Sequence, residues 1–297
     1  MANDFPTIAD FVSDALNLAP YELNEIRDAA PLVAALPAQM SSDGINHRYS
    51  VDVTRPVVGF RAQNEGRDFD HSTQRIDTVT LTILDFSWAV DKAVADAWRQ
   101  GGSEAYIARE GLQHLKAAMF KLEQQYIYGT NADADGFDGL HDSANLDGLS
   151  DEMVLEAATA GTTVGGQTSV YFLRVSEREC SMVMRGDGVQ LGDTMVQNFY
   201  DGSNKNYPAY YTPASTWVAG QIGAKYSAAR LCNIETALTD DDIYSVLALF
   251  PAGQGPNLIV MNKGSQELLR ASRTATNQTG APAPMVENVA GIRILTT

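Results

Sequence analysis

The stretch of this sequence that comes nearest to a metal-binding motif is the acidic segment 131–142. Its oxygen-bearing and turn-forming residues fall at positions one, three, five, six and twelve of a calcium-binding loop: Asn131, Asp133, Asp135, Gly136 and Asp142. The match is imperfect, because Asn131 replaces the first Asp, Asp142 replaces the bidentate Glu, and Asp138 stands where an apolar residue anchors such loops. We therefore expect a solvated turn, and rank a metal-dependent hydrolase that uses this loop low among the possible functions.

Other residue types with catalytic potential are scattered. Four histidines share no metal-binding spacing such as H-E-x-x-H: His47, His71, His114 and His141. The two cysteines, Cys180 and Cys232, stand in no metal or redox spacing, and a cysteine inside a strand is usually buried and inert. No P-loop, nucleophile elbow or dinucleotide-binding glycine motif follows a strand. We predict no catalytic residues, no cofactor site and no bound metal, and expect that the protein is not an enzyme.

Charge and length exclude further classes. The 297 residues carry a net charge of −16, which repels phosphate backbones and argues against sequence-independent binding of nucleic acid. The first residues, MANDFPTIADFV, lack the basic and long apolar regions of a signal peptide. No stretch reaches the roughly 18 apolar residues that predict a membrane span. A reduced, cytoplasmic setting is the default expectation for two unpaired cysteines.

The element on which the rest of the chain depends is the segment 103–129, which predicts one long amphipathic helix. Its apolar residues recur at spacings of three or four: Ala108, Leu112, Leu115, Met119, Leu122 and Tyr126. We expect Ser103 to cap its start and Gly129 to close its end. Gly111 is the weak point, since glycine costs about 1 kcal/mol relative to alanine inside a helix.

Two segments before this helix have little core of their own. Residues 1–43 form an arm of short helices broken by prolines, which we expect to rest on a neighbouring molecule. Residues 44–88 alternate like two strands around a polar tip at 64–66, which predicts a long β-hairpin. An isolated hairpin is marginally stable in water, so we expect this one to lie on a partner. A short helical link is expected over 87–100.

After the long helix, the chain is β-rich from 168 to 237 and then predicts a compact α/β unit over 238–297. Thr239 precedes three aspartates and so predicts a helix start, and Pro251 ends that helix. The predicted fold class is α+β.

The order of these parts resembles the major capsid protein of tailed bacteriophages, the Hong Kong 97-type fold, in its podophage-like branch. The resemblance covers about 45–297 and includes the strings VVGFRAQNEG, RIDTVTLTILDFSWAVDKAV, YIYGTNADADGFDGL and LTDDDIYSVLALFP. It divides the chain into an N-arm (1–45), an E-loop hairpin and its base (46–90), a peripheral domain (91–167) with the spine helix 103–129, a β-rich peripheral and axial segment (168–237), and an axial domain (238–297).

The resemblance implies hexamers and pentamers that close into an icosahedral shell around double-stranded DNA, without sequence-specific contacts to it. The expected location is the virion, assembled in the bacterial host cytoplasm, with no membrane. The expected partners are other copies of the chain, a portal and decoration proteins. A separate scaffold protein is also expected, because the arm is too short to resemble a fused scaffolding region.

The sequence leaves other functions open and differs from the capsid family in some features. An encapsulin compartment shell shares the fold but favours a cargo-docking helix where this chain has a broken arm. A tail or portal component is a further alternative. Some relatives join neighbours covalently through a lysine in the E-loop, but 46–90 contains five arginines and no lysine, so no such cross-link is expected. Relatives commonly continue past the last strand, so further residues are expected beyond Thr297.

Overall fold

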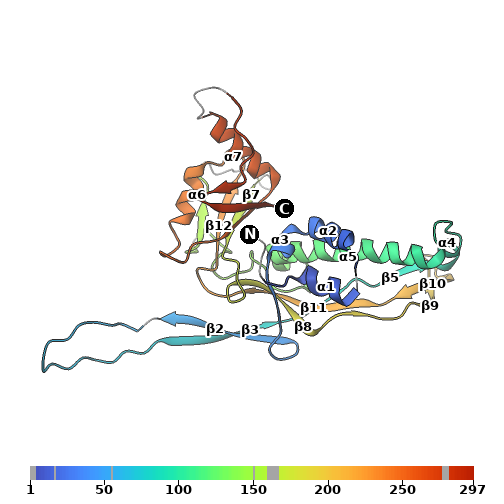
Figure 1. The fold of residues 1–297 in the computed structure, drawn as a ribbon, viewed down its shortest axis with the longest axis horizontal. Coiled ribbons are helices and arrows are strands. Elements are labelled where there is room, and N and C mark those ends of the chain that lie inside the picture. Colours follow the sequence, from blue (N-terminus) through green and yellow to red (C-terminus); the bar gives the residue numbers. More distant parts are fainter. Residues whose placement is uncertain (1–4, 17, 55, 150, 159–166, 276–280) are drawn as a thin grey trace.

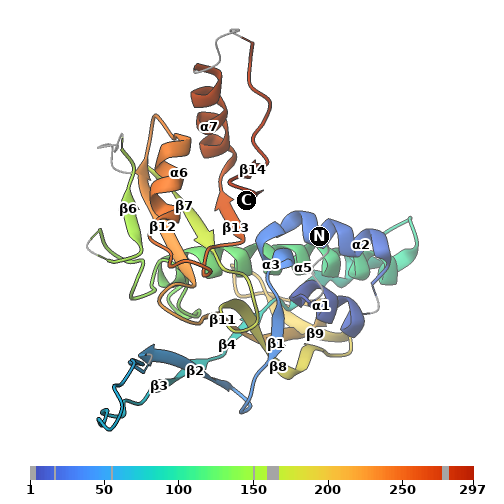
Figure 2. The same ribbon diagram turned by 60° about the vertical axis from the view of Figure 1, so that its left-hand side comes forward.

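The chain folds into an elongated body with two projections (Figure 1). This computed structural model describes residues 5–16, 18–54, 56–149, 151–158, 167–275 and 281–297. One projection is a hairpin, and the other is a six-stranded sheet with two helices, which stands on the body (Figures 1 and 2). No helix in these ranges is long and apolar enough to cross a membrane.

The long predicted helix is confirmed as α5 (Gly102–Tyr128). The apolar stripe faces inward along its second half, where Leu115, Met119, Leu122 and Tyr126 are buried. Gly129 closes the helix, as predicted. The predicted cap is wrong: Ser103 lies inside the helix, and the N-cap is Gly101, which adopts a left-handed φ of 98° and makes no side-chain cap bond.

Gly111 has a packing reason that the sequence pattern does not reveal. A Cβ atom at this position would lie 2.7 Å from Cζ2 of the Trp88 indole, far inside van der Waals contact. Trp88 is buried beside the helix and also lies against His114, with ring centroids 6.2 Å apart. Glycine, which has a low helix propensity, therefore fits here because the Trp88 indole packs directly on the helix backbone.

The arm packs on its own subunit, so the expectation that it rests on a neighbour is wrong. It consists of α1 (Ile8–Leu16), α2 (Pro20–Ala29), α3 (Pro31–Ala35) and β1 (Ala38–Met40), and β1 pairs in parallel with β8. Its apolar side chains belong to the common core: Ile8, Val12, Ile26, Leu32, Val33 and Leu36. Pro20 and Pro31 occupy first helical positions, where they start helices that fold back over α5 (Figure 1).

Two sheets lie below α1 and α5 in the view of Figure 1. One has the order β1-β8-β11-β4 and includes β4 (Thr82–Asp85), β8 (Cys180–Leu191) and β11 (Ala214–Ile222). The other has the order β5-β10-β9, from β5 (Trp88–Asp91), β9 (Met195–Tyr200) and β10 (Asn206–Thr212). The predicted helical link over 87–100 is therefore wrong in its first part, where β5 precedes the short α4 (Lys92–Asp96).

The six-stranded sheet joins segments from both sides of residue 238. Its order is β14-β15-β13-β7-β12-β6, from β6 (Val154–Glu156), β7 (Thr168–Leu173), β12 (Ala228–Ile234), β13 (Leu258–Met261), β14 (Asn288–Val289) and β15 (Ile292–Thr296). The helices α6 (Asp240–Leu247) and α7 (Lys263–Ala275) accompany it. The predicted cap is confirmed, since the Thr239 hydroxyl accepts a bond from the Asp242 backbone N–H.

The contact between Gly111 and Trp88 yields a stability prediction. Gly111→Ala should lower the free energy of unfolding by about 1 kcal/mol, because overpacking costs about 1–3 kcal/mol and improved helix propensity returns about 1 kcal/mol. In a Trp88→Phe background, where the ring is smaller, the same change should be neutral or stabilising. Urea unfolding of the four variants measures the coupling, and an equal effect in both backgrounds would contradict the packing explanation.

Candidate assembly surface

The hairpin is the part of the described chain that is least covered by its own subunit. β2 (Asn46–Thr54) and β3 (Thr73–Thr80) pair antiparallel as a separate two-stranded sheet, with Asn46 opposite Thr80. The hairpin extends away from the body, with its connecting segment at the far end (Figures 1 and 2). The predicted hairpin is confirmed, and Asn64 at its tip has the left-handed φ of 64° that a tight turn requires.

Beyond the paired strands, apolar side chains point into solvent. We call Val57, Val58, Phe60 and Phe69 the hydrophobic tip; Phe60 is fully exposed and Phe69 is 94% exposed. Burying such a side chain is worth about 1.5–3 kcal/mol. Large apolar residues gathered on one projecting element indicate a surface that another molecule covers.

Polar contacts order the tip without covering its apolar side chains. The Arg67 guanidinium donates to the backbone carbonyls of Val57 and Gly59 across the loop. Asp70 accepts the backbone N–H of Val57 at 2.9 Å. Side chains from one side of the loop thus bond the backbone of the other side. These bonds order the tip before any partner binds, which lowers the entropy cost of binding.

At its root, the hairpin is fixed to the body. The Tyr49 hydroxyl donates to the carbonyl of Ile222 at the end of β11, at 3.1 Å, and the backbone N–H of Leu81 donates to the Ile45 carbonyl at 2.8 Å. His47 is buried beside Tyr49, and desolvation lowers the pKa of its imidazole, an effect that a hydrogen bond with Gln221 opposes. The hairpin is therefore attached to the core at one end and uncovered at the other.

The arm is held differently, by a buried carboxylate. Glu123 on α5 is only 3% exposed and accepts the backbone N–H of Leu32 at 2.7 Å, at the start of α3. It also accepts the hydroxyl of Thr297, which follows β15. Burial raises the pKa of Glu123, and the hydrogen bonds oppose that rise. One side chain thus ties the arm, the long helix and the six-stranded sheet into one unit.

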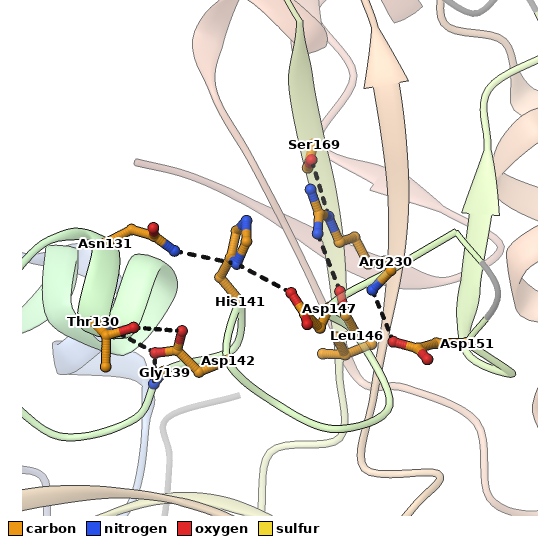
Figure 3. A network of polar contacts seen from close by, with 11 residues as sticks. Thr130, Asn131, Gly139, His141, Asp142, Leu146, Asp147, Asp151, Ser169 and Arg230 are labelled. Atoms are coloured by element: carbon orange, nitrogen blue, oxygen red, sulfur yellow. Dashed lines mark hydrogen bonds and ion pairs between the residues drawn. The ribbon is translucent and has the colours of Figure 1, made fainter.

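The structure does not bring the oxygen ligands of the calcium-like segment together. Asp142 turns back to close α5: it accepts the Thr130 backbone N–H at 2.6 Å, its hydroxyl at 2.8 Å and the Gly139 N–H at 3.3 Å (Figure 3). Asp133 pairs with Lys121 at 3.1 Å. Within the described ranges, no three His, Cys, Asp or Glu side chains converge on a point that could hold a metal ion.

Gln125 on α5 lies against the segment that resembles a calcium loop. Its amide nitrogen donates to the carbonyls of Asp133 and Phe137, so a buried helix residue organises the loop that follows. A Cβ on Gly136 would lie 2.3 Å from that amide. A side chain at the sixth position would have to displace the buried Gln125 amide, a long-range contact that local spacing does not reveal.

The cysteines and the remaining histidines do not form a site in the part of the chain that the structure describes. Cys180 is fully buried, and desolvation raises its pKa to about 12, so its thiol is not a nucleophile at neutral pH. Burial also raises the pKa of Cys232. His141 lies beside Asn131, with Nδ1 3.4 Å from its amide nitrogen (Figure 3), whereas His71 is exposed on the hairpin.

Comparison with solved structures defines the fold. A chain in the cryo-EM structure of bacteriophage Epsilon15 superposes with a TM-score of 0.62 at 20% identity, covering 87% of this chain and 84% of that one. The capsid of bacteriophage JBD30 gives 0.53 at 12% identity, covering 100% and 95%. The fold is the α+β Hong Kong 97-type capsid fold, as predicted. The holo-SrpI encapsulin from Synechococcus elongatus PCC 7942 reaches 0.47 and carries no weight for the encapsulin alternative.

The family follows from the sequence. The family model described as major capsid protein GP7 matches residues 24–278, and the chain belongs to this family. It is a tailed-bacteriophage major capsid protein, a structural protein of the capsid shell, which confirms the leading interpretation over the tail, portal and hydrolase alternatives. The narrower podophage-like assignment stays a prediction. No curated protein sequence matches the chain.

Glu123 yields a prediction with a defined pH dependence. Glu123→Ala leaves the buried N–H of Leu32 without an acceptor and should cost about 1–3 kcal/mol of unfolding free energy. Glu123→Gln keeps an oxygen for Leu32 and should cost much less at pH 7. Because the pKa of Glu123 is raised in the folded state, the protonated carboxyl contributes stability at pH values below the pKa of the unfolded chain. This contribution is lost as the pH rises through the pKa of the folded state.

Wild type should therefore lose stability relative to Glu123→Gln as the pH is raised from about 4 to 7. Urea unfolding across that range measures the difference. A difference that does not change with pH would show that the carboxylate is not destabilised by its burial.

Proposed function

We propose that this capsid protein assembles as hexamers and pentamers that close into an icosahedral shell around double-stranded DNA. The observation that carries the proposal is the hydrophobic tip, which is ordered by polar contacts but uncovered by its own subunit. A second copy is the occupant, because a capsid protein meets its own copies at high local concentration.

The expected contact is head-to-tail: the hairpin of one subunit lies on a different surface of the next. Repetition of such a heterologous contact builds closed rings when the rotation closes. Because the root is fixed and the tip projects, one hairpin shape can serve rings of five and six through small bends along its length. The buried apolar side chains of the arm are not needed for this contact, since they pack in the core of their own subunit.

The remaining assignments follow from the same family. Residues 1–45 act as N-arm, 46–90 as E-loop and base, 91–167 as peripheral domain with the spine helix, 168–237 as a β-rich peripheral and axial segment, and 238–297 as axial domain. The strands β6, β7 and β12 from the earlier segments contribute to the sheet of the axial domain. The partners are a separate scaffold protein, a portal and decoration proteins, and assembly takes place in the host cytoplasm. The net charge of −16 suits a shell that lies close to DNA without binding it tightly. The protein has a structural role and performs no catalysis.

The hydrophobic tip provides the direct test. Phe60→Ser with Phe69→Ser should abolish particles and rings in negative-stain images, because the replaced side chains lose their burial on the neighbour. The melting temperature of the free subunit should stay unchanged, since neither ring packs on its own subunit.

Tyr21→Ser is the matched control, because this aromatic side chain on α2 is also exposed but lies outside the hairpin. It should leave assembly at the wild-type level. Normal particles from the tip variant would overturn the proposed contact, and equal losses from both variants would show a nonspecific effect of removing surface aromatics.

Covalent joining of neighbours should not occur through the hairpin. Residues 46–90 contain no lysine, and a guanidinium stays protonated and is a poor nucleophile. Assembled particles dissolved in hot detergent should therefore run as a single band of subunit size on a denaturing gel. A ladder of multimers would contradict this expectation.

A further inference from the structure

The strand β9 forms an open sheet edge at the end of the molecule opposite the hairpin tip (Figure 1). It pairs with β10 along its whole length, from Met195 opposite Tyr211 to Tyr200 opposite Asn206. No other described segment pairs with it. One row of its backbone groups therefore faces outward.

Pro208 reveals which backbone groups those are. It lies opposite Asn198, and proline has no N–H, so this pair cannot exchange two hydrogen bonds. In an antiparallel ladder, hydrogen-bonded and non-hydrogen-bonded pairs alternate. The N–H and C=O groups of Asn198, and by alternation those of Val196 and Tyr200, hence point away from β10 toward the open edge.

This edge lacks the protection that the other edges have. Exposed strand edges commonly carry charged residues, prolines or bulges that discourage pairing, or are very short. Among the described edge strands of more than three residues, only β9 has no charged side chain. Its side chains are also open, with Tyr200 68% and Val196 53% exposed.

We propose that β9 pairs antiparallel with β9 of a second copy across a two-fold axis centred on Asn198. Residues whose backbone groups face outward must lie opposite residues of the same kind in the second strand. A two-fold axis centred on one residue meets this condition, whereas an axis centred between two residues would place outward-facing residues opposite inward-facing ones. Centring on Asn198 is the register that uses all three outward residues of both strands. Each resulting pair exchanges two backbone hydrogen bonds.

Side chains and charge support this register. Val196 lies opposite Tyr200 of the second copy on both sides of the axis, and aromatic pairs with β-branched residues stabilise sheets. Asp201, the nearest acidic residue after the strand, lies opposite Met195, so no carboxylates face each other across the ladder. This matters for a chain with a net charge of −16, because two copies repel each other at long range.

The contact differs in kind from that of the hairpin. It is isologous, with the same residues on both sides, and so joins subunits in pairs, whereas the head-to-tail contact builds rings. Together the two contacts would connect one ring to the next. The pairing of β9 does not depend on closed shells and can be measured on any product that the protein forms.

Cysteine cross-linking tests the register. In a hydrogen-bonded pair the Cα atoms lie about 5.5 Å apart, within the range that a disulfide spans. Asn198→Cys should therefore form covalent dimers on mild oxidation, seen on a non-reducing gel. Neither Val196→Cys nor Tyr200→Cys should dimerise alone, but a mixture of the two should. Cys180 and Cys232 are buried and give no background.

Absence of the Asn198→Cys dimer would overturn the pairing, and equal dimer yields at all three positions would show random collision.

Proline substitution tests the energetics. Asn198→Pro removes the central outward N–H and leaves the bonds to β10 in place, so the free subunit should keep its melting temperature. Pairwise association measured by analytical ultracentrifugation should weaken at least tenfold. Asn198→Ala, which keeps the N–H, should associate as wild type does. Unchanged association of the proline variant would reject the proposal, even if the Phe60 and Phe69 variant had already confirmed the role of the hairpin.

Discussion

A two-stranded β-ribbon has no interior of its own, so its apolar side chains can be buried only by other parts of the chain or by another molecule. Each face of the ribbon can be buried only by something outside it. In this protein the root of the hairpin lies against β11, and the tip is covered by nothing in the described part of its own chain. Elsewhere in the described chain, the arm lies on α5 and the six-stranded sheet is accompanied by its own helices, whereas β9 leaves an open strand edge. The uncovered apolar surface of the hairpin is therefore local, and it lies on an element that projects from the body.

The contrast between the arm and the hairpin shows how polar contacts decide which parts of a chain belong to the subunit. Glu123 gives the start of α3 an acceptor inside the core, and a buried N–H without one would be costly. This favours the arm staying with its own subunit. At the tip, Arg67 and Asp70 bond backbone groups of the loop itself, while the large apolar side chains stay exposed. An apolar surface can accept a partner without breaking hydrogen bonds, which makes it suitable for assembly.

Much of the fold could be predicted from periodicity and order. The long helix, the hairpin and the cap at Thr239 are local patterns, and the order of the parts identified the fold. The short helices of the arm were predicted, but their packing on the same subunit was not, because each helix has few apolar residues and these become sufficient only in a common core. The packing of Gly111 and Gly136 could not be predicted either, since each lies against a residue distant in the sequence, Trp88 and Gln125 respectively. Long-range packing of this kind leaves no local signal. For the same reason the outward row on β9 became visible only through its pairing with Pro208.

Hydrogen exchange of the amide groups, compared between free subunits and assembled particles, tests the central claim most directly. The segment 57–72 should be unprotected in the free subunit and should gain strong protection in the particle, while 31–38 should be protected equally in both states. Strong protection of 57–72 in the free subunit, or none in the particle, would contradict the view that the hairpin is completed by a second copy.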